Sequence, residues 1–180
     1  MDDNKKKFTH FKIHTQYSIC EGAIKISDLA KFCKEKKINA IGLSDSFNLC
    51  GALEFSEEIS KVKTQPIIGS QINFKFNELI GKIPIFAKTE KGFKNLTKLS
   101  SKSFLDVEAS QAPHCNIGDL IENSEDLIIT SGGLDSLFSQ LIKKNNPKQL
   151  QQISSKIKSV FGNRFYLEIQ RHNDYDEKVI

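Results

Sequence analysis

The stretch that decides the fold is residues 10–22, which reads HFKIHTQYSICEG. It is typical of a short β-strand, residues 10–14, that ends in a polar loop, and the stretch carries two histidines, a hydroxyl, a carboxylate and a glycine. In α/β enzymes the loops at the carboxyl ends of strands hold the ligands and the catalytic groups. We therefore expect a functional site in this loop, although its histidines and carboxylate are too interrupted for a complete metal site.

The rest of the chain predicts strands that alternate with helices. The strands are expected at residues 10–14, 40–44, 66–74, 83–88, 127–131 and 164–170. The helices are expected at residues 26–33 with a cap at Ser27, and at 51–59, 92–104, 134–143, 150–161 and from 175 onward. Residues 102–116 are irregular and predict a surface loop. Strands separated by helices indicate a parallel sheet or barrel.

The composition is ordinary for a globular protein of 180 residues, with 38% hydrophobic and 27% charged residues. This length predicts one domain or a piece of a larger protein. No apolar run approaches the ~20 residues of a membrane span, and no apolar segment follows the first lysines. The four cysteines have no paired spacing and predict free thiols. We expect a cytoplasmic protein without a membrane partner.

The net charge of +4 comes almost entirely from lysine, because Arg164 and Arg171 are the only arginines. Lysine seldom makes the forked contacts of specific phosphate or base recognition. The positive charge is therefore only weak evidence that the protein binds nucleic acid. No aromatic patch interleaved with basic residues is visible in the sequence. The lysines at 5–7 could contact a phosphate backbone, but we interpret residues 1–7 as a flexible basic N-terminus.

Several of the predicted strands end in polar residues. They are Ser44, Asp45 and Ser46 after the second strand, Gln71 near the third, 131–133 after the fifth, and Arg171 with His172 after the last. At one rim of a parallel sheet, such groups could bind zinc or manganese and activate water for phosphoester hydrolysis. They could equally be structural, with the carboxylate capping a turn and the imidazoles bonded to backbone groups.

Six segments of the chain follow one another in the order of a known family. They are residues 14–18, 43–52, 66–69, 92–99, 127–133 and 164–169. Together they resemble the polymerase and histidinol phosphatase (PHP) domain that opens the alpha subunit of bacterial DNA polymerase III. The resemblance runs from about Phe8 to the end, and residues 92–99 point to the polymerase branch. It implies a distorted TIM-like (β/α)7 barrel, truncated before the last strands, with residues 8–180 forming a PHP domain incomplete at its C-terminal end.

The resemblance also implies which residues of the family's metal site are kept. The remnant ligand positions are His14, Glu21, Asp45 and His172. The positions where ligands are lost are Lys12, Ser46, Gln71, Lys82 and Gly133. No intact metal site and no catalytic residue is therefore expected. Instead, the ammonium groups of the two lysines could neutralise the remaining carboxylates in place of a metal.

For function, the resemblance implies a noncatalytic structural module of a replicative DNA-directed DNA polymerase, which is a nucleotidyltransferase. A proofreading exonuclease subunit would dock on it. DNA would be contacted through the parent polymerase, whose palm would hold Mg, and this chain would need no cofactor. Two alternatives remain. One is a metal-dependent phosphoesterase or exonuclease with Zn or Mn at the rim, and the other is a plain nucleic-acid-binding domain.

Overall fold

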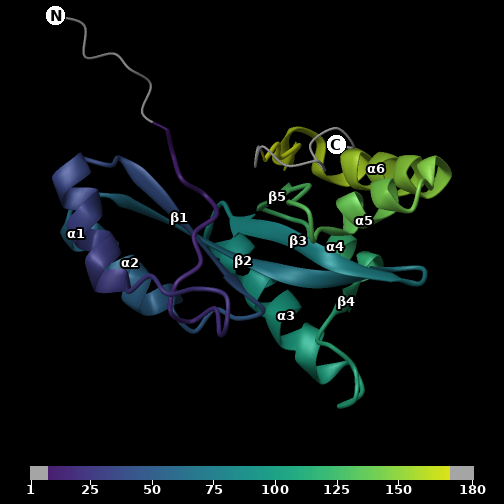
Figure 1. Cartoon of the computed structure of the whole chain (residues 1–180), viewed down its shortest axis with the longest axis horizontal. Coiled ribbons are helices and arrows are strands. Elements are labelled where there is room, and N and C mark those ends of the chain that lie inside the picture. The colour runs from purple at the N-terminus through teal and green to yellow at the C-terminus, as the bar shows by residue number, and fades with distance from the viewer. Residues whose placement is uncertain (1–7, 171–180) are drawn as a thin grey trace, which may run out of the picture. The chain divides into compact units, whose positions relative to one another are not determined.

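Strands and helices alternate through the part of the chain that the structure, a computed structural model, describes, which is residues 8–170 (Figure 1). Six strands make up the sheet, in the order β1-β2-β3-β5-β6, with β4 paired to β2. Two compact units divide the chain after Ser70, inside β2 (Gln65–Phe76), and each is described by itself. In residues 8–170, no helix has the length and apolar character to cross a membrane.

The first unit is built from β1 (Ala40–Ser46), α1 (Ile26–Lys36), α2 (Ala52–Lys61) and the start of β2. The two helices pack against each other, as Figure 1 shows. Apolar residues recur on α1 at the spacing of one helix face, which explains why this stretch forms an amphipathic helix. The buried core of the unit consists of Ile26, Leu29, Ala30, Cys33, Ile41, Leu43, Ala52, Phe55 and Ile59.

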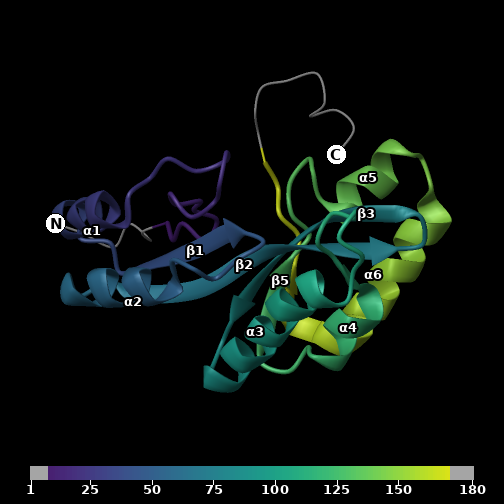
Figure 2. The ribbon, with the colours of Figure 1, turned by 90° about the horizontal axis from the view of Figure 1, so that it is seen from below.

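The second unit holds the remaining strands and helices. The strands are β3 (Leu79–Ala87), β4 (Cys115–Asn116), β5 (Leu127–Thr130) and β6 (Phe165–Tyr166). The helices are α3 (Glu90–Leu105), α4 (Ile117–Glu122), α5 (Leu137–Lys143), α6 (Pro147–Phe161) and the short η1 (Gly162–Arg164). α3 lies on one side of β3, and α5 and α6 lie on the other (Figures 1 and 2). The strands are thus covered by helices on both faces.

The sheet is mixed, so the prediction of a parallel sheet is wrong in part. β3 and β5 are antiparallel, whereas β2 pairs with β4, and β5 with β6, in parallel. Only Asn77 and Glu78 separate β2 from β3, with Asn77 at a φ of 53°. Two residues suffice for a hairpin turn but not for the crossover that parallel strands need. The α/β class is confirmed, but the described strands do not close into the predicted (β/α)7 barrel.

The strand predicted at residues 10–14 is wrong. This segment runs beside β1, where Gly42 N donates to His10 O (2.7 Å) and Ser44 N donates to Ile13 O (2.8 Å). The donors are two residues apart but the acceptors are three apart, which breaks the two-residue period of a β-ladder. The loop is thus held to β1 without forming a strand.

Other differences lie at the ends of elements. The strand predicted at 164–170 is reduced to the two residues of β6, and the loop predicted at 102–116 contains the end of α3 and all of β4. α4 was not predicted, and α1 begins after Lys25 without the predicted side-chain cap. The helix predicted from 175 onward lies outside the described residues.

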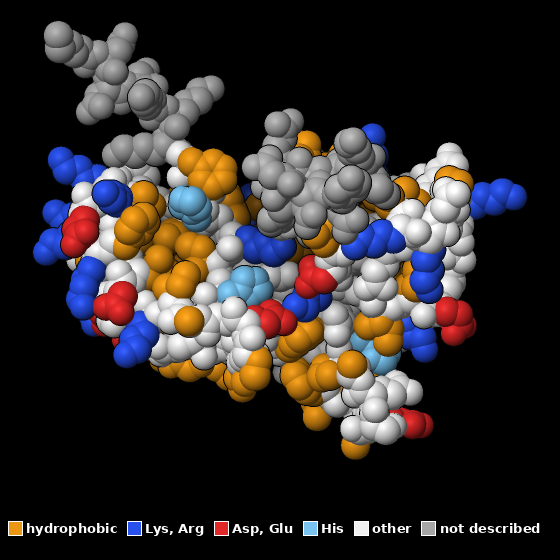
Figure 3. All heavy atoms as spheres, viewed as in Figure 1, with side chains coloured by type: hydrophobic (Ala, Val, Ile, Leu, Met, Phe, Trp, Pro, Cys, Tyr) orange, Lys and Arg blue, Asp and Glu red, His pale blue; other side chains and the backbone are white. Residues whose placement is uncertain are grey.

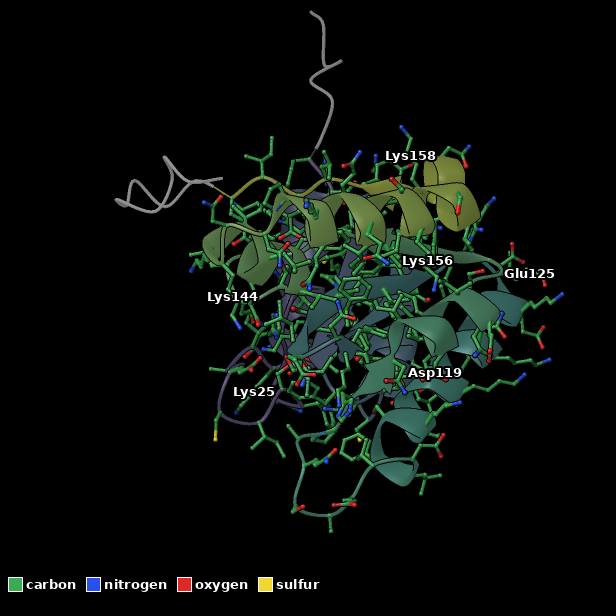
Figure 4. The ribbon with its side chains drawn as sticks, turned by 90° about the vertical axis from the view of Figure 1, so that its right-hand side faces the viewer. Lys25, Asp119, Glu125, Lys144, Lys156 and Lys158 are labelled. Carbon is green, nitrogen blue, oxygen red and sulfur yellow. The ribbon has the colours of Figure 1, made fainter. Side chains whose placement is uncertain are left out.

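Asp119 of α4 bonds to the backbone at the start of its own helix and to a lysine of α3 (Figure 4). Its Oδ2 accepts from Asn116 N (2.7 Å) in a capping box, and its Oδ1 pairs with Lys102 Nζ of α3 (2.7 Å). The side chains of Lys156 and Lys158, on α6, lie at the surface of the same unit (Figure 4).

Arg164 connects the end of α6 to the segment before β5. Its Nη1 donates to Ser124 O (2.5 Å) and Leu127 O (2.7 Å), and its Nη2 to Val160 O (3.2 Å). The guanidinium carbon also lies 5.1 Å from the centre of the Phe161 ring. One planar fork therefore satisfies three carbonyl groups at once.

Replacing Arg164 with lysine should lower the free energy of unfolding by about 1–2 kcal/mol, because a single ammonium group cannot reach all three carbonyls. Urea unfolding of the purified protein measures this loss. The reverse exchange on the exposed face of α6, Lys158→Arg, is the control and should leave stability unchanged. Equal stability of both variants would contradict the role given to the guanidinium fork.

Candidate functional site

The buried carboxylate of Asp45 is the centre of the loop that the sequence singled out. Asp45 lies at the end of β1 and is fully buried. Its Oδ1 accepts from Thr15 N (2.6 Å) and Ser18 Oγ (2.7 Å), and its Oδ2 accepts from Thr15 Oγ1 (2.7 Å). These charge-assisted hydrogen bonds replace the hydration that a buried carboxylate loses. Asp45 therefore fastens the loop to β1.

A second set of contacts holds the other carboxylate of the loop. Ser46 Oγ donates to Glu21 Oε2 at 2.5 Å, and His14 Nδ1 lies 3.6 Å from the same oxygen. His14 Nδ1 also lies 3.2 Å from Ser18 Oγ. The carboxylates of Asp45 and Glu21 are thus linked through the Ser18 hydroxyl and the His14 imidazole.

The proton on each of these groups can be assigned by counting donors. Asp45 can only accept, so Ser18 gives its single hydroxyl proton to Asp45. Ser18 Oγ then accepts from Ser46 N (3.1 Å) and from His14 Nδ1 (3.2 Å). The imidazole of His14 therefore carries a proton on Nδ1.

This arrangement is not a Ser-His-Asp catalytic triad. In a triad the histidine lies between the serine and the aspartate and takes the serine proton. Here Ser18 lies between His14 and Asp45, gives its proton to the carboxylate, and is fully buried. The serine is a structural bridge and not a nucleophile.

Residues that the sequence analysis did not assign to the site complete the loop. The Asn48 amide donates to Tyr17 O and Ser46 O, each at 2.9 Å, and Tyr17 Oη donates to Glu54 Oε2 at 2.7 Å. The hydrogen bond to Glu54, together with its negative charge, raises the pKa of Tyr17. A β-carbon at Gly22 would lie 2.1 Å from Thr15 O, so this turn requires glycine. These roles depend on tertiary contacts that no sequence motif marks.

The second unit contains three of the positions that the family resemblance marked as lost ligands. Gln71 is buried in β2, and Lys82 of β3 forms an ion pair with Asp135 (3.1 Å). Gly133 follows β5, and a β-carbon there would lie 2.5 Å from the side chain of Gln170. Of the other predicted positions, Lys12 is half-buried in the first unit, and His172 lies outside the described residues.

The described residues do not fit a zinc or manganese ion. Between residues 8 and 170, no cluster of three or more His, Cys, Asp or Glu side chains could hold a metal. Asp45 directs both oxygens at N–H and O–H donors, and Ser46 offers a proton to Glu21 instead of a lone pair to a metal. For Asp45, moreover, the structure overturns the expected lysine partner, because hydroxyl and amide groups hold this carboxylate.

Replacing Asp45 with asparagine should lower the free energy of unfolding by about 3 kcal/mol, because an amide nitrogen would face buried donors. Thermal or urea unfolding measures this change. The same exchange at Asp28 is the control, since Asp28 is exposed on α1 and pairs with Lys31 at the surface (3.0 Å). A loss no larger at Asp45 than at Asp28 would show that the loop does not depend on this carboxylate.

The raised pKa of Tyr17 gives a pH dependence with a defined sign. A raised pKa in the folded state means that the tyrosine stabilises the fold below its unfolded pKa, ~10, and loses this effect at higher pH. Wild-type protein should be more stable than Tyr17→Phe at neutral pH, and the difference should begin to shrink at about pH 10 and be lost as the pH rises through the higher folded-state pKa. Unfolding curves of both proteins across this range test it. Tyr166→Phe, an exposed tyrosine in the second unit, is the control.

Comparison with known proteins identifies the family of this chain. The PHP domain family matches residues 10–172. DNA polymerase III subunit alpha of Borreliella burgdorferi is 36% identical over 187 residues, and that of Caulobacter vibrioides is 35% identical over 179 residues. The matches cover 98% and 95% of this chain but 16% of each relative, so the chain spans about a sixth of their length.

A solved structure shares the fold. It is a candidate metal-dependent phosphoesterase from Bifidobacterium adolescentis, with a TM-score of 0.60 and 11% sequence identity. The match covers 95% of this chain and 80% of that one. Because the family match covers most of the sequence, the chain belongs to the PHP domain family.

Proposed function

We propose that this chain is the N-terminal PHP domain of a DNA polymerase III alpha subunit and serves as a structural and docking module. The observation that carries this proposal is the bonding of Asp45 and Glu21 to hydroxyl and amide donors. A phosphoesterase of this fold would need such carboxylates directed at a metal. The relatives named above, which match nearly the whole chain, support the assignment to the polymerase branch.

The proposed parent is a DNA-directed DNA polymerase that acts in chromosome replication in the cytoplasm. Its nucleotidyl transfer would be carried by Mg-binding carboxylates of a palm domain, a part of the relatives that this chain does not match. The role of this chain within that enzyme would be architectural. Its contact with DNA during synthesis would come through the parent polymerase.

The proposal gives this domain no metal of its own. Purified protein should contain only substoichiometric zinc and manganese, and its melting temperature should not change when EDTA is added, because a tightly bound metal would stabilise the folded state. Elemental analysis and thermal melting test this. Stoichiometric metal together with hydrolysis of a model phosphoester would instead support the alternative of a metal-dependent phosphoesterase or exonuclease.

The proposed partner is the proofreading exonuclease subunit of the same replicase. Its docking is an implication of the family resemblance, and a rigid, metal-independent domain suits it because little order must be gained on binding. The purified subunit and this protein should co-elute in size-exclusion chromatography at about 10 μM of each, above the micromolar range of transient interfaces. Separate elution, with both proteins folded by circular dichroism, would contradict the docking role.

A further inference from the structure

Aromatic side chains are exposed just before the loop of the site. Phe8 is 75% exposed and Phe11 41% exposed, and the His10 side chain between them is also exposed. The rings of Phe8 and His10 contact each other edge to face, with centres 4.9 Å apart. Ile13, by contrast, packs against the hydrophobic core of the first unit. The rings of Phe8 and Phe11 therefore face solvent, although Ile13, which follows them, packs against the core.

The backbone of the segment is fixed on β1. Gly42 N donates to His10 O (2.7 Å), and a β-carbon at Gly42 would lie 2.4 Å from Phe11 O. The absence of a side chain at Gly42 thus lets the segment lie directly on the strand. Aromatic rings on an anchored backbone lose less entropy on binding than rings on a mobile tail. The exposed rings belong to a preformed surface.

Many of the residues that flank these rings in the sequence are lysines. Lys5, Lys6 and Lys7 precede them in the sequence, and Lys12 follows. α1 and its flanking residues carry five lysines, from Lys25 to Lys37, against only two acidic residues. Figure 3 shows hydrophobic side chains gathered on this face of the first unit, with lysines along the edge. The surface suits a negatively charged partner that also carries flat, apolar groups.

We propose that the segment from Phe8 to Lys12 binds single-stranded nucleic acid. Bases would stack on the exposed rings, and the neighbouring lysines would contact the phosphates. Phe8, His10 and Phe11 lie between lysines in the sequence, and the fold exposes all three side chains, which makes a stacking surface that the sequence alone did not indicate. A duplex keeps its bases stacked inside and offers only phosphates, so it would use the lysines but not the rings. The proposal goes beyond the architectural role and does not depend on exonuclease docking.

The test is fluorescence anisotropy with labelled oligothymidine of about 20 nucleotides and with its duplex. The double variant Phe8→Ala/Phe11→Ala should bind the single strand about tenfold more weakly than the wild type, since a stacked base contributes that much. The control is Phe93→Ala/Phe104→Ala, which removes two exposed phenylalanines of α3 (38% and 51% exposed). It should change binding by less than about twofold. Melting temperatures establish that both variants are folded.

The wild type should also bind the single strand more tightly than the duplex, and its affinity should fall as salt increases. Equal affinity for both, unaffected by Phe8→Ala/Phe11→Ala, would overturn the proposal in favour of lysines alone. An equal loss in both double variants would overturn it by showing nonspecific apolar contact. Binding of an acidic, leucine-containing peptide through Phe8 and Phe11, without binding of oligothymidine, would make this a protein-docking surface instead.

Discussion

The cost of burying a charge governs the first unit. A carboxylate at the end of β1 has no access to water, and an unsatisfied charge there would cost more than the stability of a typical domain can offset. Thr15 and Ser18 bring three donors to it from the preceding loop. The course of that loop follows from this requirement, because its backbone must place an amide and two hydroxyls around one carboxylate. The positions of His14 and Glu21 depend on the loop in turn.

The same group of residues illustrates how hydrogen bonds alone can hold such a loop. A divalent ion would draw carboxylates and imidazoles together by its charge. Here a serine hydroxyl at position 46 lies beside Glu21, and another at position 18 lies beside His14. Both contacts are directional hydrogen bonds, so two small side chains hold the imidazole and the carboxylate in place. In the described residues, donated hydrogen bonds to Asp45 and Glu21 hold the shape of the loop.

Much of the fold could be predicted from periodicity, because long amphipathic helices and long buried strands repeat their pattern several times. α1, α3 and α6, and the strands β1, β2 and β3, were located this way. Elements of two residues, such as β4 and β6, could not be, since they exist only through their pairing partners. The short helix α4 did leave a signal, the three-residue spacing from Asn116 to Asp119.

For the site, the sequence marked Asp45, Glu21 and His14 but not the way they are held. These residues were identified from the polar loop and from the order of the segments that resemble the family. The lysine partner assumed for Asp45 was inferred from charge alone. Donor geometry decides such pairings, and Thr15, whose amide and hydroxyl both reach the carboxylate, carries no sequence signal. The exposed rings of Phe8 and Phe11 were missed for a similar reason, because exposure depends on what the fold leaves uncovered.

The placement of Ser18 has an evolutionary consequence. Its oxygen must donate in one direction and accept from two others, so the hydrogen bonds run one way, from the imidazole through the hydroxyl to the carboxylate. Such one-way chains strengthen as each member polarises the next. Alanine would interrupt the chain, and an acidic side chain would place a second charge against Asp45. Position 18 therefore tolerates very few residues, and this hydrogen-bonding role alone restricts substitution in the loop.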